Sequence, residues 1–224
     1  VAVIEPRRGT TAAYRPATHQ LIAFAGTTGM ADMNDVWTFD LAPGAPSWWP
    51  MLPSGAPPSP RHGQAVVWDP LRDRLIMTGG FYDYDFLNDV WALEMNPSPT
   101  WHQLQPAVRP AGRIAFGFGY DAVRDRLILV GGHSGYAGSG AFRIDAWQLP
   151  LSGPLALIWS QLEVLGPTPP PRWIFGMQYD RSRDRFLIAG GVTASGYSNE
   201  VWALNLGGVP SWTQIQPAPP LPPA

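Results

Sequence analysis

The stretch WDPLRDRLIMTGG, residues 68–80, joins a polar cluster to an apolar run that stops at two glycines. It returns as YDAVRDRLILVGG at 120–132 and as YDRSRDRFLIAGG at 179–191, and less closely as YRPATHQLIAFAG at 14–26. A motif that occurs four times is typical of a structural repeat and not of a single catalytic site. The sequence therefore predicts four similar units.

Other residues keep the same phase in each unit. An arginine lies seven residues before each copy, one tryptophan follows the copy, and a second lies ten or twelve residues further on, with Leu or Ile three positions later. The arginines are Arg7, Arg61, Arg113 and Arg172; the first tryptophans are Trp37, Trp91, Trp147 and Trp202; the second are Trp49, Trp101, Trp159 and Trp212. The first tryptophans are 54, 56 and 55 residues apart, which sets the period of the repeat.

Each unit reads as four short strands. In the second unit these are strand a at 63–68, strand b at 74–80, strand c at 89–95 and strand d at 101–106, all rich in β-branched, aromatic or alternating apolar residues. The segment between strands a and b is a hairpin turn, in which Asp69 is placed to accept backbone N–H groups. No helix of useful length fits, so the sequence predicts an all-β fold.

The glycines that end strand b have a structural interpretation. A phosphate-binding loop needs the N-terminus of a following helix, and here a strand follows. Glycine at this point suits a positive φ or the close approach of neighbouring backbone. The residues concerned are Gly79, Gly80, Gly131, Gly132, Gly190 and Gly191.

The glycine doublet, the aspartate-tryptophan pair that opens strand c, the tryptophan of strand d and the period together resemble the kelch repeat, whose units are blades of a β-propeller. The arginine that opens strand a resembles bacterial kelch proteins within the galactose oxidase-like superfamily. The resemblance implies a kelch domain over 1–217, with blades at about 7–53, 61–106, 113–164 and 172–217. Because one blade buries too little surface to be stable alone, we expect the tryptophans to act as buried wedges between or within blades.

The two ends of the chain carry further expectations. Residues 1–6 read as an orphan strand d, and residues 218–224 read as a proline-rich tail. We expect part of a larger ring, or association through the end blades, ahead of a closed four-bladed monomer.

The loops of a four-stranded meander divide between two ends. The a–b and c–d connections lie at one end, and the b–c and d–a connections lie at the other. The a–b turns are nearly identical, whereas the b–c loops differ freely, and variable loops on a rigid scaffold commonly carry function. The kelch resemblance points to ligand contacts there: Arg7, Arg61, Arg113, Arg172, Tyr82, Asp83, Tyr84, Asp85, His133, Tyr136 and Tyr197.

Two alternatives stay open at this end. Each arginine could instead bind carbonyl groups of its own d–a loop, as a fourfold repetition favours. The loop FYDYDF, at 81–86, occurs in one unit only; this suits recognition, but the loop could equally pack its own rings.

Composition excludes several classes of function. The net charge of −2, without charged runs, excludes the electrostatic footprint of a nucleic-acid binder, and the absence of cysteine excludes thiol chemistry and the cysteine-linked tyrosine of galactose oxidase. No apolar run approaches the ~20 residues that cross a bilayer, so no membrane insertion is predicted. The four histidines fall at different points of the repeat, so we predict no metal site and no cofactor.

These observations favour a non-enzymatic binding module whose partner is a protein or a glycan. An enzyme acting on an acidic sugar and a structural subunit of a larger assembly are the alternatives. The compartment stays open, with an extracellular or cell-surface location preferred.

Overall fold

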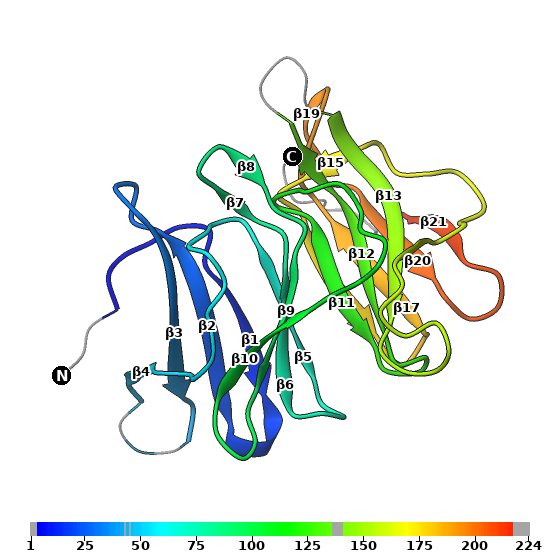
Figure 1. Ribbon diagram of the computed structural model, residues 1–224. Helices are drawn as coiled ribbons and strands as arrows, with labels where there is room; N and C mark the ends of the chain where they lie inside the picture. The colour runs from blue at the N-terminus through cyan, green and yellow to red at the C-terminus, as the bar shows by residue number, and fades with distance from the viewer. Residues whose placement is uncertain (1–3, 43, 45, 136–140, 217–224) are drawn as a thin grey trace. The chain divides into compact units, whose positions relative to one another are not determined.

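The computed structural model describes residues 4–42, 44, 46–135 and 141–216, and its regular elements are almost all β-strands (Figure 1). Within these residues the exception is a short 3-10 turn, Pro16–Thr18. The chain divides into two compact units, residues 1–105 and 106–224. The predicted all-β class and the four-stranded antiparallel sheets of a kelch propeller are confirmed.

The first unit contains two sheets, which we call blades 1 and 2. In both, the strand order follows the chain from strand a to strand d, and every pairing is antiparallel. Blade 1 consists of β1 (Thr11–Arg15), β2 (Gln20–Thr27), β3 (Asp32–Asp40) and β4 (Trp48–Met51), and blade 2 of β5 (Ala65–Asp69), β6 (Arg74–Thr78), β9 (Val90–Glu94) and β10 (Thr100–Leu104). The second unit repeats this topology in blades 3 and 4. Blade 3 consists of β11 (Gly117–Asp121), β12 (Arg126–Ser134), β13 (Ala141–Pro150) and β14 (Ser160–Gln161), and blade 4 of β16 (Gly176–Asp180), β17 (Arg185–Ala189), β20 (Val201–Asn205) and β21 (Ser211–Ile215).

The glycine doublets, and Ala25-Gly26 at the same point of blade 1, mark where strand b leaves the regular ladder. In blades 1 and 3 the strands continue past a β-bulge, whereas in blades 2 and 4 small hairpins follow the doublet. These hairpins are β7 (Phe81–Tyr82) with β8 (Asp85–Phe86), and β18 (Val192–Thr193) with β19 (Gly196–Tyr197); β15 (Arg172–Trp173) pairs with β18.

The second glycine of a doublet is required by close packing. Gly132 has φ +95°, and a Cβ on it would lie 2.6 Å from the Cβ of Phe116 and 2.8 Å from the carbonyl oxygen of Ile114. The sequence prediction of a positive φ and a close backbone approach is confirmed here.

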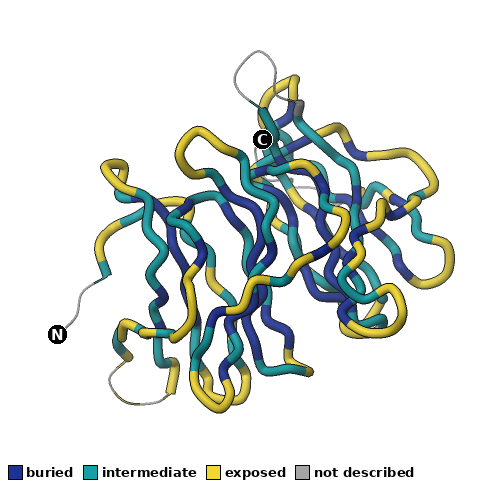
Figure 2. The backbone as a smooth tube through the Cα atoms, viewed as in Figure 1, coloured by how far each residue is buried: buried dark blue, intermediate teal, exposed yellow. Residues whose placement is uncertain are grey.

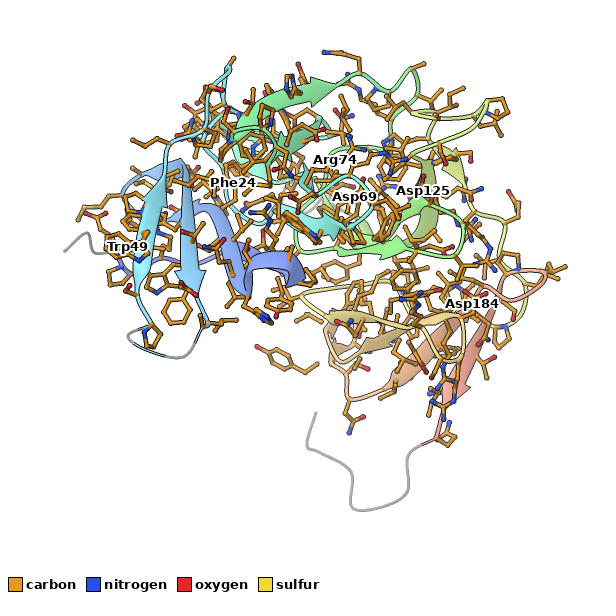
Figure 3. The ribbon with its side chains drawn as sticks, turned by 90° about the horizontal axis from the view of Figure 1, so that it is seen from below. Phe24, Trp49, Asp69, Arg74, Asp125 and Asp184 are labelled. Atoms are coloured by element: carbon orange, nitrogen blue, oxygen red, sulfur yellow. The ribbon has the colours of Figure 1, made fainter. Side chains whose placement is uncertain are left out.

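The a–b turns are organised by the aspartate that ends strand a. Asp69 is fully buried and accepts the backbone N–H groups of Leu71 and Arg72 at 3.1 and 3.3 Å, as predicted. Its other oxygen accepts the Nε–H of Arg74 at 2.9 Å, and both residues are labelled in Figure 3. In blade 1 Arg15 replaces this aspartate.

Arg15 instead makes contacts that join blade 1 to blade 2 within the first unit. The guanidinium of Arg15 donates to both carboxylate oxygens of Asp73, in the a–b turn of blade 2, and lies over the ring of Trp68 at 5.7 Å. In the second unit, Arg124 of the blade 3 turn makes the corresponding pair with Asp184 of the blade 4 turn, at 2.6 Å. The hydrogen bonds to these arginines hold the pKa of Asp73 and of Asp184 below the usual range.

Strand b is largely buried in blades 1, 2 and 3, whereas in blade 4 buried and half-buried residues alternate along it; the tips of the loops are exposed (Figure 2). In the first unit, the ring of Trp101 in blade 2 packs edge-on against Phe24 of blade 1, with centroids 5.1 Å apart. In the second unit, Trp212 of blade 4 belongs to a cluster that includes Ile128 of blade 3. The strand d tryptophans Trp101, Trp159 and Trp212 are buried, since they are only 2–3% exposed.

The prediction for Trp49 is wrong. Trp49 is 58% exposed, and Leu52, three residues later, is 91% exposed. The strand pairing explains the difference. In blade 2, Trp101 faces Leu93, which lies two residues after the strand c tryptophan. The equivalent residue of blade 1 is Phe39, and it faces Trp48. Since a shift of one residue turns a side chain to the opposite face of a strand, Trp48 takes the repeat position and Trp49 points away.

The strand c tryptophans are buried to different degrees. Trp202 is 5% exposed, whereas Trp37, Trp91 and Trp147 are half-buried.

The strands predicted for the second sequence repeat, which forms blade 2, agree with β5, β6, β9 and β10 to within a few residues. At the ends of the chain, residues 4–6 have no strand, and residues 1–3 and the predicted tail at 218–224 lie outside the described residues.

Candidate interaction face and the arginine network beneath it

In each unit the b–c loops leave the blades at the end opposite to the a–b turns (Figure 1). The d–a segments reach strand a from this same end, and the repeated arginines lie in them. We call this end the b–c face, and its description applies to each unit separately.

The repeated arginines lie below the surface of this face. Arg61, Arg113 and Arg172 are 0%, 1% and 0% exposed. Each donates its Nε–H to a carbonyl of its own d–a segment: Ser59 at 3.0 Å, Ala111 at 3.1 Å and Pro170 at 3.1 Å. Each also donates to the carbonyl of the first glycine of its doublet, at 2.8–3.1 Å. These contacts agree with the alternative in which each arginine binds carbonyl groups of its own d–a loop.

An acidic residue at the start of strand c completes each network. Arg61 donates to both oxygens of Asp89, at 2.6 and 2.8 Å, and Asp89 also accepts the indole N–H of Trp91 at 2.7 Å. The same arrangement joins Arg7, Asp35 and Trp37 in blade 1, Arg113, Asp145 and Trp147 in blade 3, and Arg172, Glu200 and Trp202 in blade 4. The half-buried tryptophans are therefore held by a hydrogen bond as well as by packing.

Three of these carboxylates, those of Asp89, Asp145 and Glu200, have a lowered pKa. Burial disfavours the charged form of Asp89, but the hydrogen bonds and the charge of Arg61 outweigh it, and the pKa of Asp89 lies below its usual value. Burial and the paired arginine act in the same opposed way on Asp145 and Glu200, and the pKa of each is lowered. The arginine, the acidic residue and the tryptophan are a repeated structural device, and their charges are neutralised inside the blade.

The b–c loop of blade 2 is the β7–β8 hairpin. Its two tip residues, Asp83 and Tyr84, have φ of 47° and 65°, the left-handed conformation of a tight hairpin turn. At its base the rings of Phe81 and Phe86 meet edge-on with centroids 5.0 Å apart. Tyr82 is 36% exposed and Tyr84 is 76% exposed, and both Asp83 and Asp85 are exposed. The loop thus packs its phenylalanines and presents its tyrosines and carboxylates.

In the second unit the predicted residues are in different surroundings. His133 is half-buried against the rings of Phe142 and Trp173, at 5.7 and 5.2 Å, and burial lowers its pKa. Tyr197, at the end of the β18–β19 hairpin, is 78% exposed. Tyr136 lies outside the described residues.

Sequence reasoning missed other polar residues of this face. Arg8 is exposed, and His62 forms a 2.7 Å contact with Asp32. Both residues directly follow a repeated arginine, and this position in the sequence could have identified them as residues of the b–c face. Across the described ranges, no cluster of three or more His, Asp or Glu side chains could hold a metal ion, and no helix is long and apolar enough to cross a membrane.

Comparison with known proteins agrees with the repeat. The family model of the KLHDC2/KLHL20/DRC7 Kelch-repeats domain matches residues 2–145. Adagio-like protein 2 of Oryza sativa subsp. japonica is 28% identical over 220 residues, which cover 95% of this chain and 33% of that protein. Adagio protein 3 of Arabidopsis thaliana is 26% identical over 189 residues, covering 80% of this chain and 29% of that protein.

These relatives are plant proteins, so the resemblance to bacterial kelch proteins stays a prediction. The chain spans about a third of the length of the relatives it matches. The matched family model, the four-stranded blades and the repeated arginine network together establish that this chain belongs to the kelch-repeat family.

Proposed function

We propose that this chain is a protein-interaction module, and that the tip of the β7–β8 hairpin is a principal contact with the partner. The observation that carries the proposal is the 76% exposure of Tyr84 on a hairpin whose base is packed. Kelch-repeat membership supports the same function, because rings of blades commonly serve as scaffolds for binding loops.

The hairpin is pre-organised for binding. The backbone N–H of Leu87 donates to the carbonyl of Gly80 at 2.8 Å, and Phe81 exchanges backbone hydrogen bonds of 3.2 and 2.9 Å with His62. A loop that is already ordered loses little conformational freedom in the complex. Tyrosine adds an apolar ring and a hydroxyl in one side chain with few rotatable bonds, and it is enriched among residues that dominate interfaces.

The repeated arginines have a different role in this proposal. Their donors are directed to carbonyls and carboxylates inside the blades, so they support the loops and do not meet the partner. Of the residues expected to contact a ligand, we therefore retain Tyr82, Asp83, Tyr84, Asp85 and Tyr197, which are exposed.

The test compares Tyr84→Ala with Tyr14→Ala. Tyr14 is 42% exposed and lies near the a–b turn of blade 1, at the opposite end of its blade, so it controls for loss of an exposed tyrosine. Affinity capture from an extract of the source organism, quantified by mass spectrometry, would identify partners, and binding of each variant to a purified partner would follow. We expect Tyr84→Ala to weaken binding about thirtyfold, as for a residue that dominates an interface, and Tyr14→Ala to change it less than twofold.

Equal losses for the two variants would contradict the proposal. A glycan array runs beside the capture, because exposed tyrosines also stack on sugars. Binding of glycans without any protein partner would replace the protein-interaction proposal with a carbohydrate-binding one.

A further inference from the structure

A polar cleft lies beside the β7–β8 hairpin in the first unit. It has a volume of about 260 Å³, and Arg8, Thr27, Met30, Asp32 and His62 are among the residues that line it. The ring of His62 lies 5.7 Å from that of Phe81, at the base of the hairpin. The cleft is thus next to the contact surface proposed above.

The walls of the cleft are fixed by hydrogen bonds. Arg8 and Thr27 exchange backbone hydrogen bonds of 2.9 Å in both directions. The hydroxyl of Thr27 donates to the carbonyl of Ala31 at 3.1 Å and accepts the N–H of Gly29 at 3.1 Å. These hydrogen bonds order the b–c loop of blade 1 around the cleft.

Arg8 brings an uncompensated positive charge. Its side chain is exposed, and within the described part of the chain its guanidinium has neither a hydrogen bond nor an ion pair. The preceding arginine shows the contrast, because Arg7 is paired with Asp35 at 2.6 Å. Five N–H donors on a planar group suit a carboxylate, which accepts two of them side by side.

The negative charge of the cleft is already engaged. The Nδ1 atom of His62 lies 2.7 Å from Oδ1 of Asp32, whose side chain is 17% exposed. Since an ionised carboxylate only accepts hydrogen bonds, Nδ1 carries the hydrogen in this contact. Among the described residues that line it, the cleft therefore offers a free cation and no free carboxylate, which favours an anionic ligand over a basic one.

We infer that this cleft binds the carboxylate of an aspartate or glutamate in a segment of the protein partner, with Arg8 as its main donor; the inference rests on the proposed function. Met30 is fully exposed at the rim of the cleft. It provides an apolar contact for a residue next to the acidic one, because methionine adapts its shape to varied neighbours. The expected partner segment therefore joins an acidic residue to an apolar one.

The experiment selects binders from a random heptapeptide display library on the intact chain. It compares wild type with Arg8→Glu, and the matched control is Arg181→Glu, which makes the same change of charge at an exposed arginine in the a–b turn of blade 4. We expect wild type and Arg181→Glu to enrich peptides that contain Asp or Glu, and Arg8→Glu to bind them at least tenfold more weakly. A selected peptide with Glu replaced by Gln should lose affinity to the same degree.

Melting curves confirm that each variant is folded. Equal losses for Arg8→Glu and Arg181→Glu, or unchanged binding of the Gln peptide, would overturn the carboxylate site. Peptides that depend on Tyr84 and not on Arg8 would overturn it while leaving the proposed function intact, and the absence of any selected peptide would count against both.

Discussion

Asp89→Asn is the substitution that tests the arginine network most directly. It keeps the shape of the side chain but removes the charge that faces Arg61, whose guanidinium is 0% exposed and has Asp89 as its carboxylate partner at 2.6 and 2.8 Å. Removing one member of a buried ion pair costs roughly 3–5 kcal/mol, because the remaining charge is left buried without compensation. Asp89 keeps 19% of its side chain exposed, so we expect a value near the lower end, about 3 kcal/mol.

Urea unfolding followed by tryptophan fluorescence measures this loss. The slope of the unfolding free energy is about 1–3 kcal/mol per molar urea, so the midpoint should fall by roughly 1–3 M. Asp83→Asn is the matched control, because Asp83 is exposed at the tip of the β7–β8 hairpin, and its effect should stay within about 0.5 kcal/mol. If Asp89→Asn destabilised the chain no more than Asp83→Asn, the network would not be a structural element, and the assignment of the arginines to the scaffold would fail.

Three further predictions concern stability. Trp101→Ala should cost about 3–5 kcal/mol and Trp49→Ala less than about 1 kcal/mol, because Trp101 is 3% exposed and Trp49 is 58% exposed; urea midpoints of the two variants would contradict this if they were equal. Gly132→Ala should destabilise the chain by at least about 1 kcal/mol more than Gly153→Ala in thermal melts, because both glycines have positive φ but only at Gly132 would a Cβ meet other atoms within 4 Å. The pKa values of Asp89, Asp145 and Glu200 are lowered on folding. The stability that these residues provide is therefore present above the carboxyl pKa of the unfolded chain, about 4, and is lost as pH falls through the lower folded values. Urea midpoints measured from pH 3 to pH 7 should decline in acid, and less steeply for Asp89→Asn than for wild type.

The sequence predicted the parts of the fold that repeat. Four copies of one motif identified strands a and b, their turn and the glycine doublet, because each of these features answers a local requirement of the backbone. Asp69 is an example, since an aspartate followed by Pro70 already indicates a turn in which the carboxylate accepts N–H groups. The family and the number of strands in a blade followed from the same observations.

The prediction failed where the choice between two neighbouring residues depends on pairing. Trp48 and Trp49 are adjacent, and only the register of β4 against β3 shows that Trp48 faces Phe39. The spacing of the other tryptophans did not separate them, because both fall within the range of intervals seen in the repeat. Likewise, a repeated arginine near a variable loop does not reveal whether its donors point outward; the carboxylates that bind them lie 28 or more residues later in the chain.

Repetition also separates scaffold from candidate site on the b–c face. A residue present in every blade has a structural role that every blade shares. Arg61 is an example, because it donates hydrogen bonds to Ser59, Gly79 and Asp89 inside its own blade. A feature that recognises one partner has no reason to recur. Tyr84 on the β7–β8 hairpin and Arg8 in the cleft with His62 occur once, and both are exposed. Since the shared network neutralises the buried charges and fixes the loops, the partner should be selected by these unrepeated side chains, and exchanging the FYDYDF loop at 81–86 for another sequence should change the partner without changing the fold.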